Sequence, residues 1–240
     1  MKINRKGAAV KKLNLFVLGA CLSLCCQAVT GYAQEITNNG ATVAAGGEQS
    51  PAFDADILAG AEKSLNAIQS VDADFIQTSS NNEQLFFGHL KLLRPNKMLL
   101  TYEDPEMPRI IADGYSVIYV EDSLEQVTYL GLDDTPAFFL IQDTTSFSDP
   151  RIKVLDVEKN DLQVRITVAM AEDSLAGKMT LVFSAKDFQL VGWEITDAKR
   201  VKTVISLQNV RMNVPIEKKT FEFINPYTSK KKQYPFLRNN

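Results

Sequence analysis

Hydrophobic residues recur at every second position through most of the chain after residue 70, a spacing typical of β-strands with one buried face. Turn-forming pairs such as Asp113-Gly114 and Asn160-Asp161 separate several of these alternating runs. The pattern predicts a mainly β domain with about eleven antiparallel strands in a single sheet. The predicted strands cover residues 71–78, 84–93, 98–103, 109–112, 115–121, 125–131, 151–158, 162–170, 178–184, 189–196 and 201–209, with a short one near Phe221.

Two segments have a helical pattern instead. Asp54 is placed to cap a helix near 54–69, and a short helix is predicted near 135–142, where Thr135-Pro136 resembles a cap followed by proline. The second helix is apolar nearly all round, so it needs cover on several sides. A sheet of this many strands is expected to curve, with the helices over its concave face. The apolar stripe of the first helix is Ile57, Leu58, Ala61, Leu65 and Ile68, and the second helix contains Phe138, Phe139 and Leu140.

The alternation also predicts which side chains face the interior. If His89 and Lys91 face solvent, the residues of opposite parity in the same strand face inward. On the pattern alone a solid core is the favoured interpretation and a lined cavity is the alternative. The two faces of 115–121 and 151–158 are almost equally apolar, so their inward sides are not assigned. The predicted lining is Phe86, Leu90, Leu92, Met98, Leu100, Tyr102, Val127, Tyr129, Val164, Ile166, Val168, Met179, Leu181 and Phe183; Leu162, Met170, Val191, Trp193 and Ile195 continue the parities of their strands.

Arg94 shares the inward parity of Leu90 and Leu92, so it is expected to point into the interior unless a bulge intervenes. A buried guanidinium must find acceptors, and unpaired carbonyl groups at helix ends are suitable ones. The alternative is an arginine at a strand end that pairs with a surface acid.

The first 33 residues have the pattern of a cleaved secretory signal: five basic residues, an apolar run from 13 to 26, and small residues around Tyr32. A lipoprotein signal is the alternative, because Leu18-Gly19-Ala20-Cys21 resembles a lipobox. The expected organisation is a signal peptide at 1–33, a flexible leader at 34–53, one domain at 54–227 and a basic tail at 228–240.

Charge and candidate chemistry exclude several functions. Without residues 1–33 the chain carries 21 basic and 29 acidic residues, and this acidic balance argues against nucleic-acid binding. All three cysteines lie in the signal segment and His89 is the one histidine, so a His/Cys metal site or a cysteine nucleophile is not expected. Asp72 and Asp74 share a strand face and are interpreted as the solvated side of an edge strand. We expect no enzyme activity and no cofactor.

Several motifs between residues 88 and 136 resemble LolA-type outer-membrane lipoprotein carriers, which are periplasmic chaperones; the likeness runs roughly from Ile57 to Phe223. These are Gly88-x-Leu90-x-Leu92-x-Arg94-Pro95-Asn96, Tyr102-x-x-Pro105, Ile111-x-Asp113-Gly114, Tyr119, Gln126-Val127 and Thr135-Pro136. The resemblance implies an unclosed β-barrel with a helical lid over an apolar cavity. It also implies that Arg94 acts as a latch, because in this family the matching arginine hydrogen-bonds the lid and holds the empty cavity shut.

The same resemblance implies partners and a location. The cargo would be acylated lipoproteins, received from an inner-membrane lipoprotein-releasing ABC transporter and passed to an outer-membrane lipoprotein acceptor. The protein would be a soluble periplasmic monomer that binds no nucleic acid. Two alternatives stay open: a lipid-anchored acceptor of the same fold, supported by Cys21, and a periplasmic regulator that senses lipoproteins.

Overall fold

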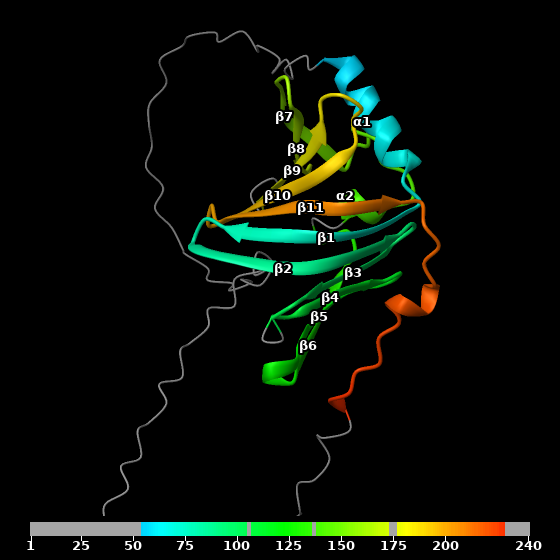
Figure 1. The fold of residues 1–240 in the computed structure, drawn as a ribbon, viewed down its shortest axis with the longest axis vertical. Helices are drawn as coiled ribbons and strands as arrows, with labels where there is room; N and C mark the ends of the chain where they lie inside the picture. The colour runs from blue at the N-terminus through cyan, green and yellow to red at the C-terminus, as the bar shows by residue number, and fades with distance from the viewer. Residues whose placement is uncertain (1–53, 105–106, 136–137, 173–176, 229–240) are drawn as a thin grey trace, which may run out of the picture.

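The computed structural model describes residues 54–104, 107–135, 138–172 and 177–228, apart from the side chains of Asn82 and Glu83. Its strands form one antiparallel sheet in the order β6-β5-β4-β3-β2-β1-β11-β10-β9-β8-β7 (Figure 1). The signal peptide, the leader and nearly all of the basic tail lie outside the described residues, so those expectations stay predictions. The strands are β1 (Ser70–Ser79), β2 (Asn82–Leu93), β3 (Lys97–Tyr102), β4 (Arg109–Asp113), β5 (Ser116–Glu121), β6 (Gln126–Gly131), β7 (Ile152–Lys159), β8 (Gln163–Met170), β9 (Gly177–Ser184), β10 (Leu190–Asp197) and β11 (Lys202–Met212).

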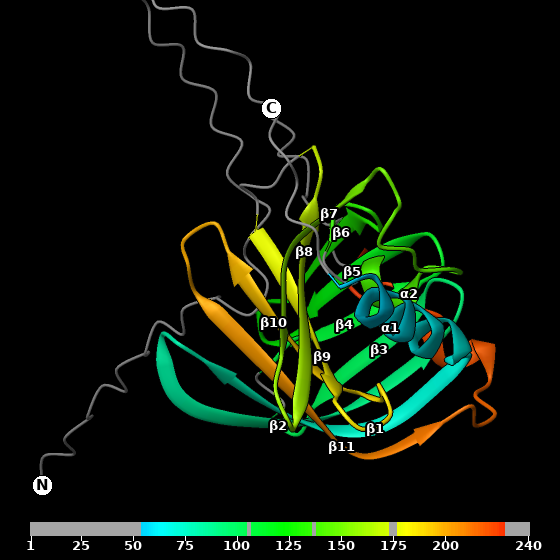
Figure 2. The same cartoon turned by 90° about the horizontal axis from the view of Figure 1, so that it is seen from above.

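The sheet is curled but not closed, because its edge strands β6 and β7 do not pair with each other. Helix α2 (Phe138–Ile141) lies between these two strands in the sequence, and α1 (Ala55–Ala67) precedes β1. Figure 2 shows the sheet as a trough, with both helices on its concave side near the end where β1 begins. This architecture confirms the predicted single antiparallel sheet, unclosed and with few helices.

The first helix forms as its sequence predicts. The Asp54 carboxylate accepts hydrogen bonds from the backbone N–H groups of Asp56 and Ile57 at 3.0 and 3.3 Å, which satisfies two donors that have no partner inside the helix. The predicted stripe is buried at Ile57, Ala61 and Leu65. Helix α1 therefore packs its apolar side against the sheet and leaves polar residues on its other faces.

A second, smaller apolar cluster lies on the outer face of the sheet. Ile111, Ile118 and Val120 are buried there beneath Phe223 and Tyr227 of the segment that follows β11. The opposite side chains of β5, such as Val117, belong to the interior cluster. Both faces of 115–121 are apolar because both are covered, one by the interior and one by this C-terminal segment.

The same arrangement corrects two predicted lining residues. In the pairing of β5 with β6, Val120 lies opposite Val127 and Ile118 opposite Tyr129, so both β6 side chains share the outer face. Val127 packs against the outer cluster and Tyr129 is exposed. The predicted short strand near Phe221 is also wrong, because Lys218–Phe221 is a 3-10 helix, η2, that contacts β3 and β4.

Bulges explain where simple alternation fails in the second half of the sheet. The register of β7 against β8 skips Leu155, so Ile152, Val154 and Val157 all reach the interior. The register of β10 against β9 skips Val191, which leaves Val191 outside the interior cluster although Trp193 is within it. Leu162 precedes β8 and is exposed, contrary to its predicted parity.

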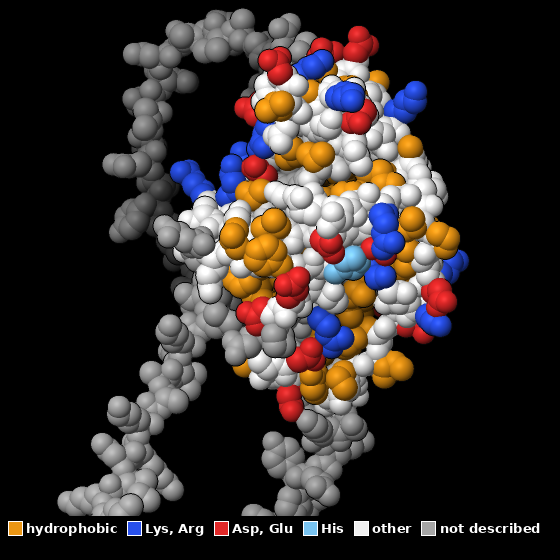
Figure 3. Space-filling model, in the orientation of Figure 1, with side chains coloured by type: hydrophobic (Ala, Val, Ile, Leu, Met, Phe, Trp, Pro, Cys, Tyr) orange, Lys and Arg blue, Asp and Glu red, His pale blue; other side chains and the backbone are white. Residues whose placement is uncertain are grey.

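Asp72 and Asp74 do not lie on an edge strand, because β1 is central and pairs with both β2 and β11. The ring nitrogens of His89 lie 2.9 Å from Asp72 Oδ1 and Asp74 Oδ1. Burial favours protonation of Asp72, but hydrogen bonds from Arg211 and Lys91 outweigh it and hold the pKa of Asp72 below its ordinary value. Figure 3 shows acidic, basic and histidine side chains gathered on this outer face. We interpret these ion pairs as contacts between neighbouring strands that stabilise the sheet.

Candidate functional site

The concave face of the sheet is the candidate site, and its lining is apolar and buried. The predicted residues from β2, β3, β8 and β9 share this face, as alternation requires. Phe86, toward the start of β2, is only half-buried and lies outside the interior cluster, and Tyr102 packs against that cluster while partly buried. The buried lining residues are Leu90, Leu92, Met98, Leu100, Val164, Ile166, Val168, Met179, Leu181 and Phe183.

Helix α2 covers this lining. All four of its residues, Phe138 to Ile141, are buried in the same cluster as the strands. The rings of Phe138 and Phe139 meet edge to face with centroids 6.0 Å apart, and the Arg151 guanidinium lies 4.8 Å from the centroid of Phe138. Pro136 lies outside the described residues, so the predicted cap followed by proline stays a prediction; the Thr135 hydroxyl donates to the Leu132 carbonyl at 3.0 Å.

Arg94 connects the floor of the trough to this helix. Its side chain is 8% exposed, and Nε donates to the Leu140 carbonyl oxygen at 3.0 Å. Nη2 lies 3.5 Å from Thr145 Oγ1, which is a weak contact. Nη1 has no hydrogen-bond partner among the described residues. Beside it, the Asn96 backbone N–H donates to the Ile141 carbonyl at 2.7 Å, so the end of β2 holds two carbonyl groups of α2.

Arg94 stays positively charged although its side chain is buried. Desolvation lowers the pKa of Arg94 to about 10, and the nearby Asp143 opposes that shift. The side chain is therefore protonated at neutral pH and offers N–H donors but no acceptor. A guanidinium left without its carbonyl partner in this apolar setting would cost several kcal/mol, so the bond to Leu140 stabilises the observed position of α2.

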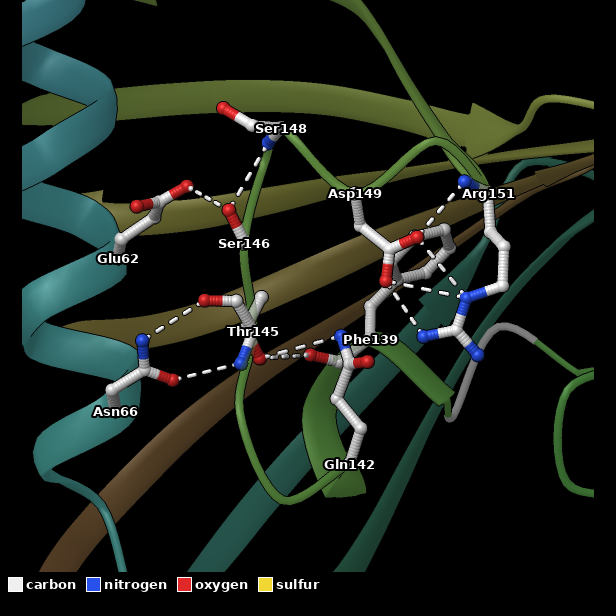
Figure 4. Close-up of polar contacts among 9 residues, drawn as sticks. All are labelled: Glu62, Asn66, Phe139, Gln142, Thr145, Ser146, Ser148, Asp149 and Arg151. Atoms are coloured by element: carbon white, nitrogen blue, oxygen red, sulfur yellow. Dashed lines mark hydrogen bonds and ion pairs between the residues drawn. The ribbon is translucent and has the colours of Figure 1, made fainter.

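Helix α1 contacts the loop that follows α2 and so supports that helix. The Asn66 amide donates to the Thr145 carbonyl at 2.9 Å and accepts from the Thr145 N–H at 2.8 Å (Figure 4). Glu62, one turn earlier, accepts from Ser146 Oγ and from the Phe147 N–H. Thr145 Oγ1 also lies within 3.5 Å of Gln142 Nε2. The loop is thus held by α1, and the helix before it is held by Arg94.

Sequence reasoning missed Glu62, Asn66 and Thr145. Asn66 and Thr145 are 79 residues apart in the chain, and nothing local indicates that they meet. The available signal was weak: Glu62 and Asn66 are four residues apart, a spacing that puts two polar side chains on one side of a helix.

Asn66→Ala should loosen the lid. Loss of both hydrogen bonds to Thr145 should speed amide hydrogen exchange of α2 and its loop about tenfold, because each bond contributes roughly 0.5–1.5 kcal/mol. The control is Ser64→Ala on the same helix, since the Ser64 hydroxyl donates to the Phe188 carbonyl and not to the loop. Equal exchange of the Gln142 amide in both variants would show that α1 does not support α2.

Two further observations concern metals and membranes. Within the described ranges, no group of three or more His, Cys, Asp or Glu side chains is placed to hold a metal ion. Over the same ranges, none of the helices combines the length and the apolar character needed to cross a bilayer.

The chain thus combines an unclosed antiparallel sheet with a buried apolar concave face and a short apolar helix over that face. Residues 66–224 match the family model described as outer membrane lipoprotein carrier protein LolA. The chain belongs to this family.

Curated relatives and solved structures are similar to the chain over much of its length. The outer-membrane lipoprotein carrier protein of Legionella pneumophila is 30% identical over 173 residues, which cover 69% of this chain and 84% of that protein. The protein of the same description from Helicobacter hepaticus is 26% identical over 162 residues, covering 66% and 80%. Among solved structures, a LolA superfamily protein from Nitrosomonas europaea overlaps 70% of this chain and 96% of its own, at 13% identity and a TM-score of 0.44. The lipoprotein LppX of Mycobacterium tuberculosis overlaps 69% and 99%, at 15% identity and a TM-score of 0.38.

Proposed function

We propose that this chain is a periplasmic carrier that holds the acyl chains of lipoproteins inside the curled sheet and hands them to an acceptor at the outer membrane. The observation that carries the proposal is the apolar concave face covered by α2, with one buried arginine bonded to the covering helix. Family membership supports the same class of cargo. The chain acts as a monomer and as a carrier, not as an enzyme.

The energetics of acyl chains explain why such a carrier needs direct partners. Burial stabilises a chain by about 0.8 kcal/mol per methylene, so one 16-carbon chain hides on the order of 12 kcal/mol from water. Cargo held in this way does not leave by dissolving. It must be received from an inner-membrane lipoprotein-releasing transporter and passed directly to an outer-membrane acceptor.

Arg94 supplies the means to weaken the hold on cargo. Acyl chains and α2 compete for the same apolar face, so cargo has to displace the helix and break the bond between Arg94 Nε and the Leu140 carbonyl. Reforming that bond favours the closed, empty state by roughly 1.5–3 kcal/mol, because one partner is charged. Arg94 is therefore a latch that assists release and is not a contact that secures cargo.

A displacement assay tests the proposed function. The purified protein without residues 1–33 should take up an environment-sensitive hydrophobic dye, and palmitate or a diacylated lipopeptide should displace it. Displacement at a stoichiometry of one lipopeptide per chain supports a carrier. A folded protein that admits neither the dye nor the lipopeptide would show that the concave face is a solid core, and the proposed function would be wrong.

A further inference from the structure

Gln77 is a buried polar side chain among the apolar ones of the concave face. Gln77 of β1 is 1% exposed and has the same strand parity as Ala73 and Phe75, which belong to the interior cluster. Its neighbours across the sheet are Phe86 on β2 and Ile205 on β11, both apolar. A buried amide in such surroundings costs free energy unless its polar atoms are paired.

The Gln77 amide is held in place from one side only. The Tyr102 hydroxyl donates to Gln77 Oε1 at 2.7 Å, reaching across Gly88 of the intervening strand. The Phe75 ring packs edge to face on the Tyr102 ring with centroids 5.2 Å apart, and a Cβ on Gly88 would lie 2.4 Å from Phe75 Cζ. The absence of a side chain at Gly88 therefore leaves room for the Phe75 ring, which packs on the Tyr102 ring.

The amide nitrogen of Gln77 has no acceptor among the described residues. In the part of the chain that the structure describes, Nε2 donates no hydrogen bond, and only Oε1 has a partner. Exchanging the two ends of the amide would not remove the excess, since the pair would still hold an N–H or O–H group without an acceptor. Burial, followed by the nearby Tyr119 phenol, raises the pKa of Tyr102 above its ordinary value, so its hydroxyl stays a donor at neutral pH.

Acylated lipoproteins carry hydrogen-bond acceptors next to their acyl chains. Each acyl chain ends in an ester or amide carbonyl, which must enter the interior with the chain or stop at its edge. A carbonyl that loses water without gaining a donor destabilises the complex, and an amide N–H without a partner is a group that can hydrogen-bond it.

We propose that Gln77, positioned by Tyr102, donates a hydrogen bond to an ester carbonyl of the bound diacylglyceryl group. This assignment rests on the proposed function, since it names which part of the cargo the interior recognises. Gln77 is seven residues along β1 from Ser70, the end that pairs with Leu93 beside Arg94, a separation of about 23 Å. The carbonyl groups therefore lie at the end of the trough away from α2, and the acyl chains run toward Arg94.

Matched ester and ether lipopeptides test the assignment, because an ether of equal chain length lacks the carbonyl. In competition with the bound dye, the wild-type protein should prefer the ester about 3- to 10-fold, the value of one neutral hydrogen bond. Gln77→Leu should bind both lipopeptides equally while keeping the affinity for the ether. Tyr102→Phe, which keeps the ring and removes the hydroxyl, should reduce the preference and serves if Gln77→Leu does not fold.

Thr180→Val is the control, because the buried Thr180 hydroxyl pairs with Thr167 at 2.9 Å away from the interior cluster. This variant should keep the full preference for the ester. Equal affinity of the wild-type protein for both lipopeptides, or an undiminished preference in Gln77→Leu, would overturn the assignment and leave the carrier function intact. Binding of neither lipopeptide would overturn the proposed function and the assignment with it.

Discussion

Arg94→Leu should load acyl cargo as well as the wild-type protein and release it to an acceptor about tenfold or more slowly. Leucine extends the apolar row of Leu90 and Leu92, so binding to the concave face is preserved. The variant loses the charge-assisted bond to the Leu140 carbonyl, worth roughly 1.5–3 kcal/mol, so closure of α2 no longer helps to expel the chain. Arg94→Lys should fall between the two, because lysine keeps the charge but has no planar fork of donors.

The measurement is transfer of a labelled lipoprotein from loaded carrier to membranes that bear the acceptor. Arg165→Leu is the matched control, since Arg165 pairs with Glu158 and Glu194 away from the lid. Transfer by Arg94→Leu at the wild-type rate would exclude the latch. If Arg165→Leu also transfers slowly, the slow transfer results from the loss of a positive charge and not from the loss of the bond between Arg94 and Leu140.

Leu100→Glu should reduce dye and lipopeptide uptake by more than a hundredfold in protein that still folds. Leu100 is 4% exposed and lies on the concave face. A carboxylate at this position would have to lose its water whenever an acyl chain binds, which weakens binding. Desolvating an unpaired charge costs several kcal/mol, comparable with burying several methylenes of cargo.

The control for Leu100→Glu is Leu85→Glu, because Leu85 is 57% exposed and the change leaves the interior untouched. Thermal unfolding of both variants shows whether the fold is retained. If folded Leu100→Glu takes up the dye with wild-type affinity, the concave face is not the binding surface.

Alternation identified the strands and most of the interior because a strand with one buried face shows its parity directly. Met179, Leu181 and Phe183 are examples, all on one face of β9 and all in the interior cluster. The method failed where a bulge shifted the parity, as at Val191, and where both faces were covered, as at Val127. Both causes depend on pairing partners far away in the sequence, which a local pattern does not contain.

The candidate site was predictable to a similar extent. Arg94 could be placed inward because its parity follows an apolar row, and a buried cation requires acceptors. Gln77 lies two residues from Phe75 and therefore faces the same, buried side of its strand. A polar residue at a position predicted to be buried was a signal in the sequence that the alternation argument did not use. Its pairing with Tyr102 joins two side chains 25 residues apart in the chain, and this contact is visible only in the folded sheet.

Site-specific photocrosslinking tests the central claim, that acyl chains enter the curled sheet, most directly. Tyr119 packs against the interior cluster, whereas Tyr115, four residues earlier, is 88% exposed. A benzophenone amino acid at either position is a conservative replacement of one aromatic ring by another. With a lipoprotein labelled in its acyl chains, the account predicts crosslinking at position 119 and none at position 115. Crosslinking at 115 alone, or to an equal extent at both, would contradict it.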